Sequence, residues 1–129
     1  MKKILTATFA ILLVLAFTTV ALADGLTITS ASNSISSSGT TVTMGQTTYT
    51  NQTATRIRHV KYLQRYSGGS WSTYTTITTN AYSTSYYSDS AARTVPSGYS
   101  YRVVTYHYAY EGTTIVDTEV RTSGSVYVS

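Results

Sequence analysis

The chain has 129 residues, no cysteine and a formal net charge of +4. This length suits a single domain of ordinary size, and the lack of cysteine excludes a disulfide scaffold and a metal–thiolate protein. Only 11% of the residues are charged, which argues against a nucleic-acid binder that depends on net charge.

The first 23 residues have the pattern of a secretory signal peptide. Two lysines precede an apolar run from Ile4 to Val20, and Ala21-Leu22-Ala23 is a small-x-small cleavage site. The alternative is an uncleaved membrane anchor, but the apolar run is short for a spanning helix of about 20 residues. We therefore expect signal peptide 1–23, a secreted mature domain over 24–129, and no stable membrane span after cleavage.

The mature domain keeps a small positive charge and a distinctive aromatic composition. Two of the nine Lys and Arg residues leave with the signal, so seven remain against five Asp and Glu, a net charge of +2. All 13 Tyr residues stay, whereas both Phe residues are removed. Low net charge, together with residue types that suit a pleated sheet, predicts a folded β domain rather than a disordered chain.

Alternating polar and apolar residues, separated by turn signals, predict a series of strands. In chain order the expected strands are 26–29, 40–49, 55–66, 71–78, 82–88, 99–110, 115–121 and 125–128. The serine-rich run 30–39 is either a loop or a weak edge strand. Turns are expected at 51–54, 67–70, 95–98 and 111–112. The predicted fold class is all-β, a single antiparallel β-sandwich of about seven or eight strands.

The strand over 55–66 has two candidate buried faces. Ile57 and Leu63 share one parity along the strand, whereas Val60 and Tyr62 share the other. A regular strand cannot bury both pairs against one core, because alternate residues point to opposite faces. We therefore expect a β-bulge near Arg58-His59 that shifts the phase.

Two segments of the chain together resemble a known group of proteins. They are Val60-Lys-Tyr-Leu-Gln-Arg-Tyr-Ser-Gly-Gly-Ser-Trp71 and Pro96-Ser-Gly-Tyr-Ser-Tyr-Arg-Val103. Behind a signal peptide, this pair is similar to segments of small secreted β-sandwich proteins from Gram-positive bacteria, a domain of unknown function. The resemblance covers most of 26–128, implies the sandwich fold and secretion, and carries over no functional residue.

The segment after Pro96 also resembles the tyrosine corner of immunoglobulin-like and fibronectin-like sandwiches. There a Tyr near the start of a late strand sends its hydroxyl back to the upstream backbone. Tyr101 is the candidate for this structural role. Trp71, the only Trp, follows a hairpin turn, and we expect it to pack in the core or at the sheet edge rather than to be exposed for binding.

Several tyrosines share one face of the strand 99–110. Tyr106, Tyr108 and Tyr110 have the same parity as Arg102, opposite to Tyr101. If the core lies on the side of Tyr101, these rings form an outward platform suited to sugars, peptides or other proteins. The alternative is that the rings only stabilise the sheet as cross-strand aromatic pairs.

Four of the seven basic residues of the mature domain fall between 56 and 65. They are Arg56, Arg58, Lys61 and Arg65. A basic stripe of this kind suits an anionic wall polymer or a membrane surface. The ordinary alternative is an edge strand, where Lys and Arg discourage pairing between molecules.

The sequence supports catalysis poorly. His59 and His107 are the only histidines, no G-x-S-x-G elbow is present, and no carboxylate pair is evident. His107 with Glu111 lacks a third metal ligand at a suitable spacing. We therefore expect a non-enzymatic protein without cofactor or metal.

The functional expectation is a secreted or surface-associated module that binds carbohydrate, cell-envelope polymer or another protein, and not nucleic acid. Two alternatives remain open. One is a structural, self-associating surface or matrix protein, since polar strands with few charges are prone to edge pairing. The other is a secreted bacteriocin-like protein.

Overall fold

The structure is a computed structural model that describes residues 25–129. Its strands form one six-stranded antiparallel sheet, so the predicted all-β antiparallel class is confirmed. The strands are β1 (Ile28–Ser38), β2 (Thr41–Ser67), β3 (Ser70–Thr94), β4 (Tyr99–Glu111), β5 (Thr114–Thr122) and β6 (Val126–Val128). The predicted signal peptide lies outside the described residues. Within 25–129, no helix has the length and apolarity needed to cross a bilayer.

β2 and β3 are each one long strand where two shorter ones were expected, so six strands replace the predicted seven or eight. The predicted turn at 51–54 is wrong, because the backbone stays extended there. The Asn51 side chain, counted as a turn signal, accepts a hydrogen bond from the Thr27 amide at 2.8 Å instead. Pairing between β2 and β3 is nevertheless interrupted from Tyr49 to Ala54, near Ser83, whose φ is +50°.

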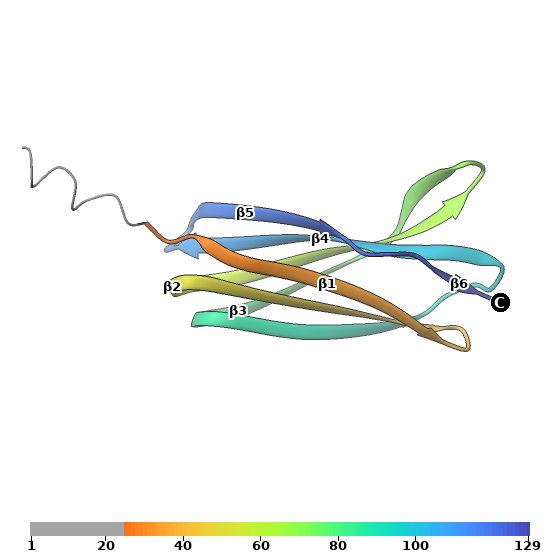
Figure 1. The fold of residues 1–129 in the computed structure, drawn as a ribbon, viewed down its shortest axis with the longest axis horizontal. Helices are drawn as coiled ribbons and strands as arrows, with labels where there is room; N and C mark the ends of the chain where they lie inside the picture. The colour runs from red at the N-terminus through yellow and green to blue at the C-terminus, as the bar shows by residue number, and fades with distance from the viewer. Residues whose placement is uncertain (1–24) are drawn as a thin grey trace, which may run out of the picture.

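The interruption divides the sheet into two leaves. The first leaf contains β1, residues 41–49 of β2 and residues 86–94 of β3. The second leaf contains the rest of β2 and β3 together with β4, β5 and β6. The strands run along the long axis of the molecule, and the start of β1 and the C-terminus lie at opposite ends (Figure 1). The sheet is therefore curled, with β2 and β3 passing from one leaf to the other.

The core lies between the inner faces of the two leaves. Val42 and Met44 of the first leaf belong to the same buried cluster as Leu63, Tyr101 and Val103 of the second. A smaller cluster is built on Leu26, Ala54, Ile57 and Ala109. Because β2 curls from one leaf into the other, apolar side chains from its two halves pack against each other.

The predicted bulge near Arg58-His59 is wrong. Pairing runs unbroken from Arg56 to Leu63 toward β3 and from Arg56 to Tyr66 toward β4, and the register toward β3 shifts only at Leu63/Gln64. The strand needs no phase change because His59 and Lys61 are completely buried on the same face as Ile57 and Leu63. Val60 and Tyr62 therefore point outward.

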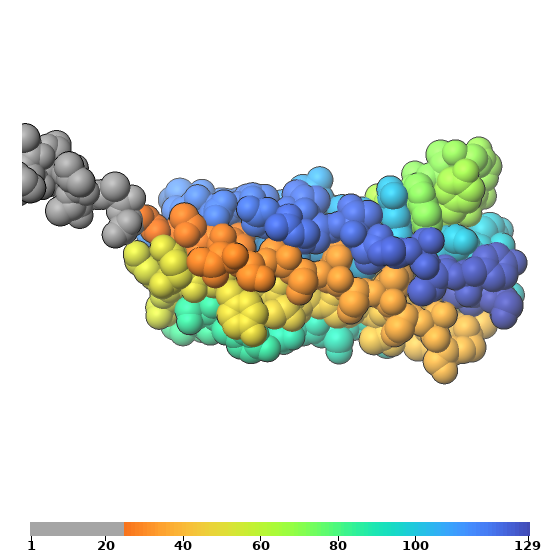
Figure 2. Space-filling model, viewed as in Figure 1, coloured from red at the N-terminus to blue at the C-terminus, as the bar shows by residue number. Residues whose placement is uncertain are grey.

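The serine-rich run 30–39 forms an edge strand, the second of its two predicted alternatives. Among the described residues β1 pairs with β2 alone, and its other edge is bridged to β5 by side chains. The Ile28 amide donates to Asp117 Oδ2 at 2.8 Å, and Arg121 Nε donates to the Ala31 carbonyl at 3.1 Å. In Figure 2 this seam is the contact between the orange and blue atoms. These side-chain bonds occupy backbone groups that an edge otherwise leaves open.

The predicted hairpin and corner are observed. Gly68 and Gly69 both have positive φ, as a two-residue hairpin turn of the primed type requires. After the predicted turn at 95–98, the buried Tyr101 donates its hydroxyl hydrogen to the Pro96 carbonyl at 2.7 Å. This bond fixes the entry of the chain into β4.

Replacing Tyr101 with Phe removes this hydrogen bond and keeps the ring. We expect the free energy of unfolding to fall by about 1 kcal/mol, the usual net contribution of such a bond, measured by urea denaturation. The control is Tyr127→Phe, whose ring is 63% exposed and whose stability should be unchanged. Equal stability of the Tyr101→Phe variant and the wild type would contradict the corner role.

Candidate binding face and buried polar cluster

The outer surface of the second leaf carries a row of half-exposed aromatic rings. Even-numbered residues of β2 beyond Ala54 and of β4 point away from the core, and cross-strand neighbours extend their rows. We call this surface the tyrosine–arginine face. Apart from the Ser and Thr residues between them, its members are Arg56, Arg58, Val60, Tyr62, Gln64, Tyr66, Trp71, Asn80, Tyr82, Arg102, Val104, Tyr106, Tyr108, Tyr110, Ile115, Val120 and Tyr127.

The rings of this face contact one another. Tyr62 and Tyr106 lie edge to face with centroids 5.5 Å apart, and Tyr106 and Tyr108 are 6.1 Å apart. Tyr66 and Trp71 pair at 5.3 Å beside the hairpin turn. These spacings are those of favourable aromatic pairs, so the rings are held in place before any ligand arrives.

Arginines are the only charged residues of this face, and each is held by neighbours. Arg102 lies over the Trp71 ring at 4.5 Å and donates to the Gln64 side chain at 2.8 Å. Arg58 Nε donates to the Asn80 side-chain oxygen Oδ1 at 3.0 Å. Such contacts reduce the rotamer entropy that an arginine loses when it binds an anion.

The predicted platform is only partly present. Tyr106, Tyr108 and Arg102 lie on the tyrosine–arginine face and are half-buried. Tyr110 shares that face but is 4% exposed, because Arg56 lies over its ring at 3.9 Å. Burial raises the pKa of the Tyr108 hydroxyl, and the nearby Tyr62 and Tyr106 add to this. The phenol therefore stays protonated at neutral pH and is available as a hydrogen-bond donor.

The predicted basic stripe does not form one surface. Arg56 and Arg58 point outward, whereas Lys61 is completely buried in the core. Arg65 lies beside the Tyr99 ring at 4.4 Å, near the hairpin end of the inner face. The edge-strand alternative is also wrong, because β2 pairs with β3 on one side and with β4 on the other in this region.

The sequence analysis did not place Tyr62, Tyr66 and Trp71 on the tyrosine–arginine face. Trp71 is half-buried on β3, an edge strand of the second leaf, where Tyr66 and Arg102 contact its ring. The sequence pattern that could have placed Tyr62 and Tyr66 on this face is their even parity, which they share with Arg58. This pattern did not decide which face is buried, because Lys61 and His59 at odd positions are residue types usually found on the surface.

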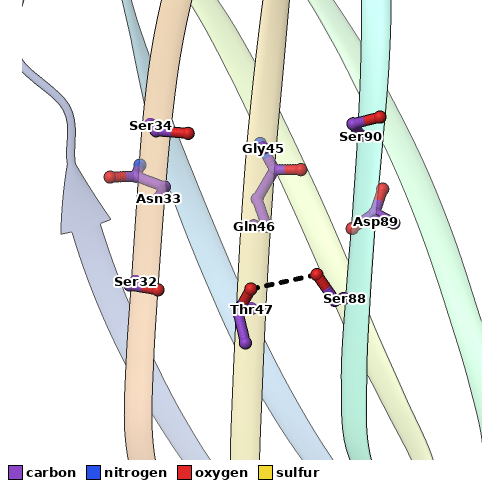
Figure 3. Close-up of a pocket in the computed structure, with 9 residues that line it drawn as sticks. All are labelled: Ser32, Asn33, Ser34, Gly45, Gln46, Thr47, Ser88, Asp89 and Ser90. Atoms are coloured by element: carbon purple, nitrogen blue, oxygen red, sulfur yellow. Dashed lines mark hydrogen bonds between the residues drawn. The ribbon is translucent and has the colours of Figure 1, made fainter.

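The outer surface of the first leaf is chemically different. It carries small hydroxyl side chains around Gly45, with a hollow of about 440 Å³ lined by Ser32, Asn33, Ser34, Gly45, Gln46, Thr47, Ser88, Asp89 and Ser90 (Figure 3). Thr47 and Ser88 hydrogen-bond across two strands at 3.0 Å. A Cβ on Gly45 would approach Ser34 Oγ to 3.0 Å. The hollow has no ring to stack on, so it offers less to a ligand than the tyrosine–arginine face.

A buried polar cluster joins the two leaves inside the core. Thr48 and Asp89 come from the first leaf, and His59, Lys61 and His107 come from the second. His59 Nδ1 donates to Asp89 Oδ1 at 2.5 Å, and Lys61 donates to Asp89 Oδ2. The Thr48 hydroxyl bonds both His59 Nε2, at 2.7 Å, and His107 Nδ1, at 2.6 Å. One carboxylate thus anchors a continuous chain of hydrogen bonds.

The cluster shifts the pKa values of its members. Burial acts to raise the pKa of Asp89, but hydrogen bonds and positive charge from His59 and Lys61 outweigh it and hold the pKa below its ordinary value. Burial, together with the charges of His59 and Arg121 and against the opposing effect of Asp89, lowers the pKa of His107 to about 4. At neutral pH Asp89 is therefore ionised and His107 is neutral.

Thr48, His59 and Asp89 follow the order of a hydroxyl–histidine–carboxylate triad. The Thr48 side chain, however, is completely buried and shares its hydroxyl between two imidazoles. A nucleophile must approach a substrate within reacting distance. The geometry therefore does not present Thr48 to a substrate, and the cluster is better suited to holding the leaves together.

A scan of the sequence against models of protein families finds no match, and a search among curated proteins finds no sequence that matches. The resemblance to secreted Gram-positive proteins therefore stays a prediction.

Acidification should weaken the fold through His107. Its pKa is about 4 in the folded state against 6.5 for an ordinary His, so between these values the unfolded chain binds the extra proton. The neutral, buried His107 therefore contributes about 3 kcal/mol to the free energy of unfolding above pH 6.5. This contribution is lost as the pH falls from 6.5 toward 4. Urea titrations across this range measure it.

The control is His107→Gln, which removes the titrating group and should flatten the loss over the same pH range. While its carboxyl group is free, Asp89 adds a second loss at lower pH, because a depressed carboxyl pKa stabilises the fold only above its unfolded value near 3.8. Equal slopes for wild type and His107→Gln between pH 6.5 and 4 would contradict the assignment.

Proposed function

We propose that this chain is a secreted, non-enzymatic β-sandwich module of immunoglobulin-like or fibronectin-like type that binds an anionic carbohydrate or cell-envelope polymer. The observation that carries the proposal is the row of half-exposed Tyr62, Tyr106 and Tyr108 rings on an open sheet face whose only charges are arginines. The sandwich type is supported by the curl of the sheet and by the bond from Tyr101 to Pro96.

The chemistry of the face matches such a polymer. Flat rings with a polar tip stack on the apolar faces of sugar rings, and their hydroxyls bond sugar hydroxyls. Arg58 and Arg102 flank the row and present planar guanidinium groups to phosphate or carboxylate groups. Tyr, Trp and Arg are also the residues that contribute most to binding at interfaces.

Binding to purified cell walls and to soluble anionic polysaccharides tests the proposal. We expect Tyr106→Ala and Tyr108→Ala each to weaken binding about tenfold, since a central aromatic residue commonly contributes more than 1 kcal/mol. The matched control is Tyr86→Ala on the other leaf, where the ring is 48% exposed. Binding that is equal in all three variants, or absent in the wild type, would contradict the proposed face.

A second candidate, self-association, is favoured by the free edge of β3. Within residues 25–129 this 25-residue strand pairs with β2 alone, and it contains no Lys or Pro and only Asp89 and Arg93 as charges. Long edges with few charges are templates for pairing between molecules. Unlike β1, β3 has no strand of the described residues 25–129 packed along its other edge.

If this edge pairs, the sedimentation coefficient of the protein should rise with concentration. Thr76→Lys places a charge on an exposed position of the edge strand and should reduce that rise, because charges on edge strands oppose pairing. Thr43→Lys, on β2 of the other leaf, is the control. A wild type that stays monomeric at high concentration would reject this second candidate.

A further inference from the structure

Lys61 is a charged side chain whose position in the core calls for an explanation. It has no exposed surface, and its ammonium group contacts the carboxylate of Asp89. The two residues lie on different leaves and 28 positions apart in the sequence. Because the desolvation of two buried charges commonly exceeds their mutual attraction, an ion pair is a costly way to fill a core.

The surroundings of Asp89 hold its carboxyl group in a fixed orientation toward the amine. His59 Nδ1 donates to Oδ1 at 2.5 Å, and Thr79 Oγ1 donates to Oδ2 at 3.0 Å. Gln46, the cross-strand neighbour of Asp89, is 2% exposed, and neither polar atom of its side chain has a hydrogen-bond partner among the described residues. The core therefore holds an amine, a carboxyl and an unpartnered amide group at one place.

We propose that Lys61 and Asp89 condense into an intramolecular isopeptide bond that ties the two leaves together covalently. The ammonium and the carboxylate give one amide and one water. The new bond joins Lys61 Nζ to Asp89 Cγ, and the bond from Cγ to Oδ2 breaks. No oxidant or other reactant is needed, and both buried charges disappear in the product.

The proton transfers follow the observed contacts. Lys61 passes one proton to Oδ2 along their hydrogen bond, so the neutral amine and acid form without any exchange with solvent. The amine attacks Cγ, and its second proton leaves with Oδ2 as water. The hydrogen bond from His59 stabilises the charge that develops on Oδ1, as donors aimed at an oxyanion do.

The fixed contact between the two groups makes the condensation fast enough to occur, and each molecule needs to react only once. Two groups held in contact react as if at an effective concentration of about 10⁵ M or more. The ionised state of Asp89 makes the neutral pair a minor form, but a single turnover after folding needs no high rate. In a chain without cysteine, the bond would restrain the unfolded state as a disulfide does.

Mass spectrometry of tryptic peptides from the denatured mature protein tests the bond directly. Trypsin does not cleave at a lysine whose amine is acylated, so a linked protein should release 59–65 joined to 66–93. This product is lighter than the two peptides together by the mass of one water. Uncut linear 59–93 has the same mass, so fragmentation must show two N-termini, at His59 and Tyr66, in the joined product. Recovery of 59–61, 62–65 and 66–93 as separate peptides from folded wild type would overturn the proposal.

Two variants sharpen the test. Lys61→Arg keeps the charge but supplies no amine for this chemistry, so the joined peptide should be absent, and its persistence would overturn the assignment of Lys61. His59→Gln should slow the appearance of the joined peptide after refolding, and an unchanged rate would overturn the role given to His59. None of these measurements depends on a ligand, so the proposal stands or falls separately from the proposed function.

Discussion

The carboxylate of Asp89 is the point at which the two leaves are joined. It accepts hydrogen bonds from His59 and Lys61 of β2 and from Thr79 of β3, so a residue of the first leaf is held by three residues of the second. The chain continues through Thr48 to His107 of β4. A charged lysine and two imidazoles are tolerated inside because nearly all their polar atoms find partners.

This network explains how a chain with few aliphatic residues forms a core. The apolar clusters lie on either side of the polar one, the larger around Met44, Leu63 and Val103 and the smaller around Ile57 and Ala109. Between them the leaves meet through hydrogen bonds and through Tyr87, whose ring stacks on His59 at 4.5 Å. Polar contacts therefore replace part of the hydrophobic packing between the two leaves.

The two outer surfaces differ because parity along each strand separates residue types. In the first leaf, outward positions carry mainly small hydroxyl side chains together with the Tyr49–Tyr86 pair, whereas in the second they carry Tyr, Val and Arg. The inner network fixes this parity. With His59 and Lys61 turned inward, Arg58, Val60 and Tyr62 must face outward, so the same contacts that hold the leaves also create the tyrosine–arginine face.

The sequence by itself determined the all-β class, the strands over 40–49, 55–66 and 99–110, the Gly-Gly hairpin and the corner at Tyr101. These features depend on local alternation and on turn residues, which act over a few positions. Tertiary structure alone decided that β2 and β3 run through both leaves, and which side of β2 is buried. An alternating strand defines two faces but does not say which one meets the core. Here the answer depended on Asp89, which lies 28 residues after Lys61 and makes the burial of that lysine and of His59 possible.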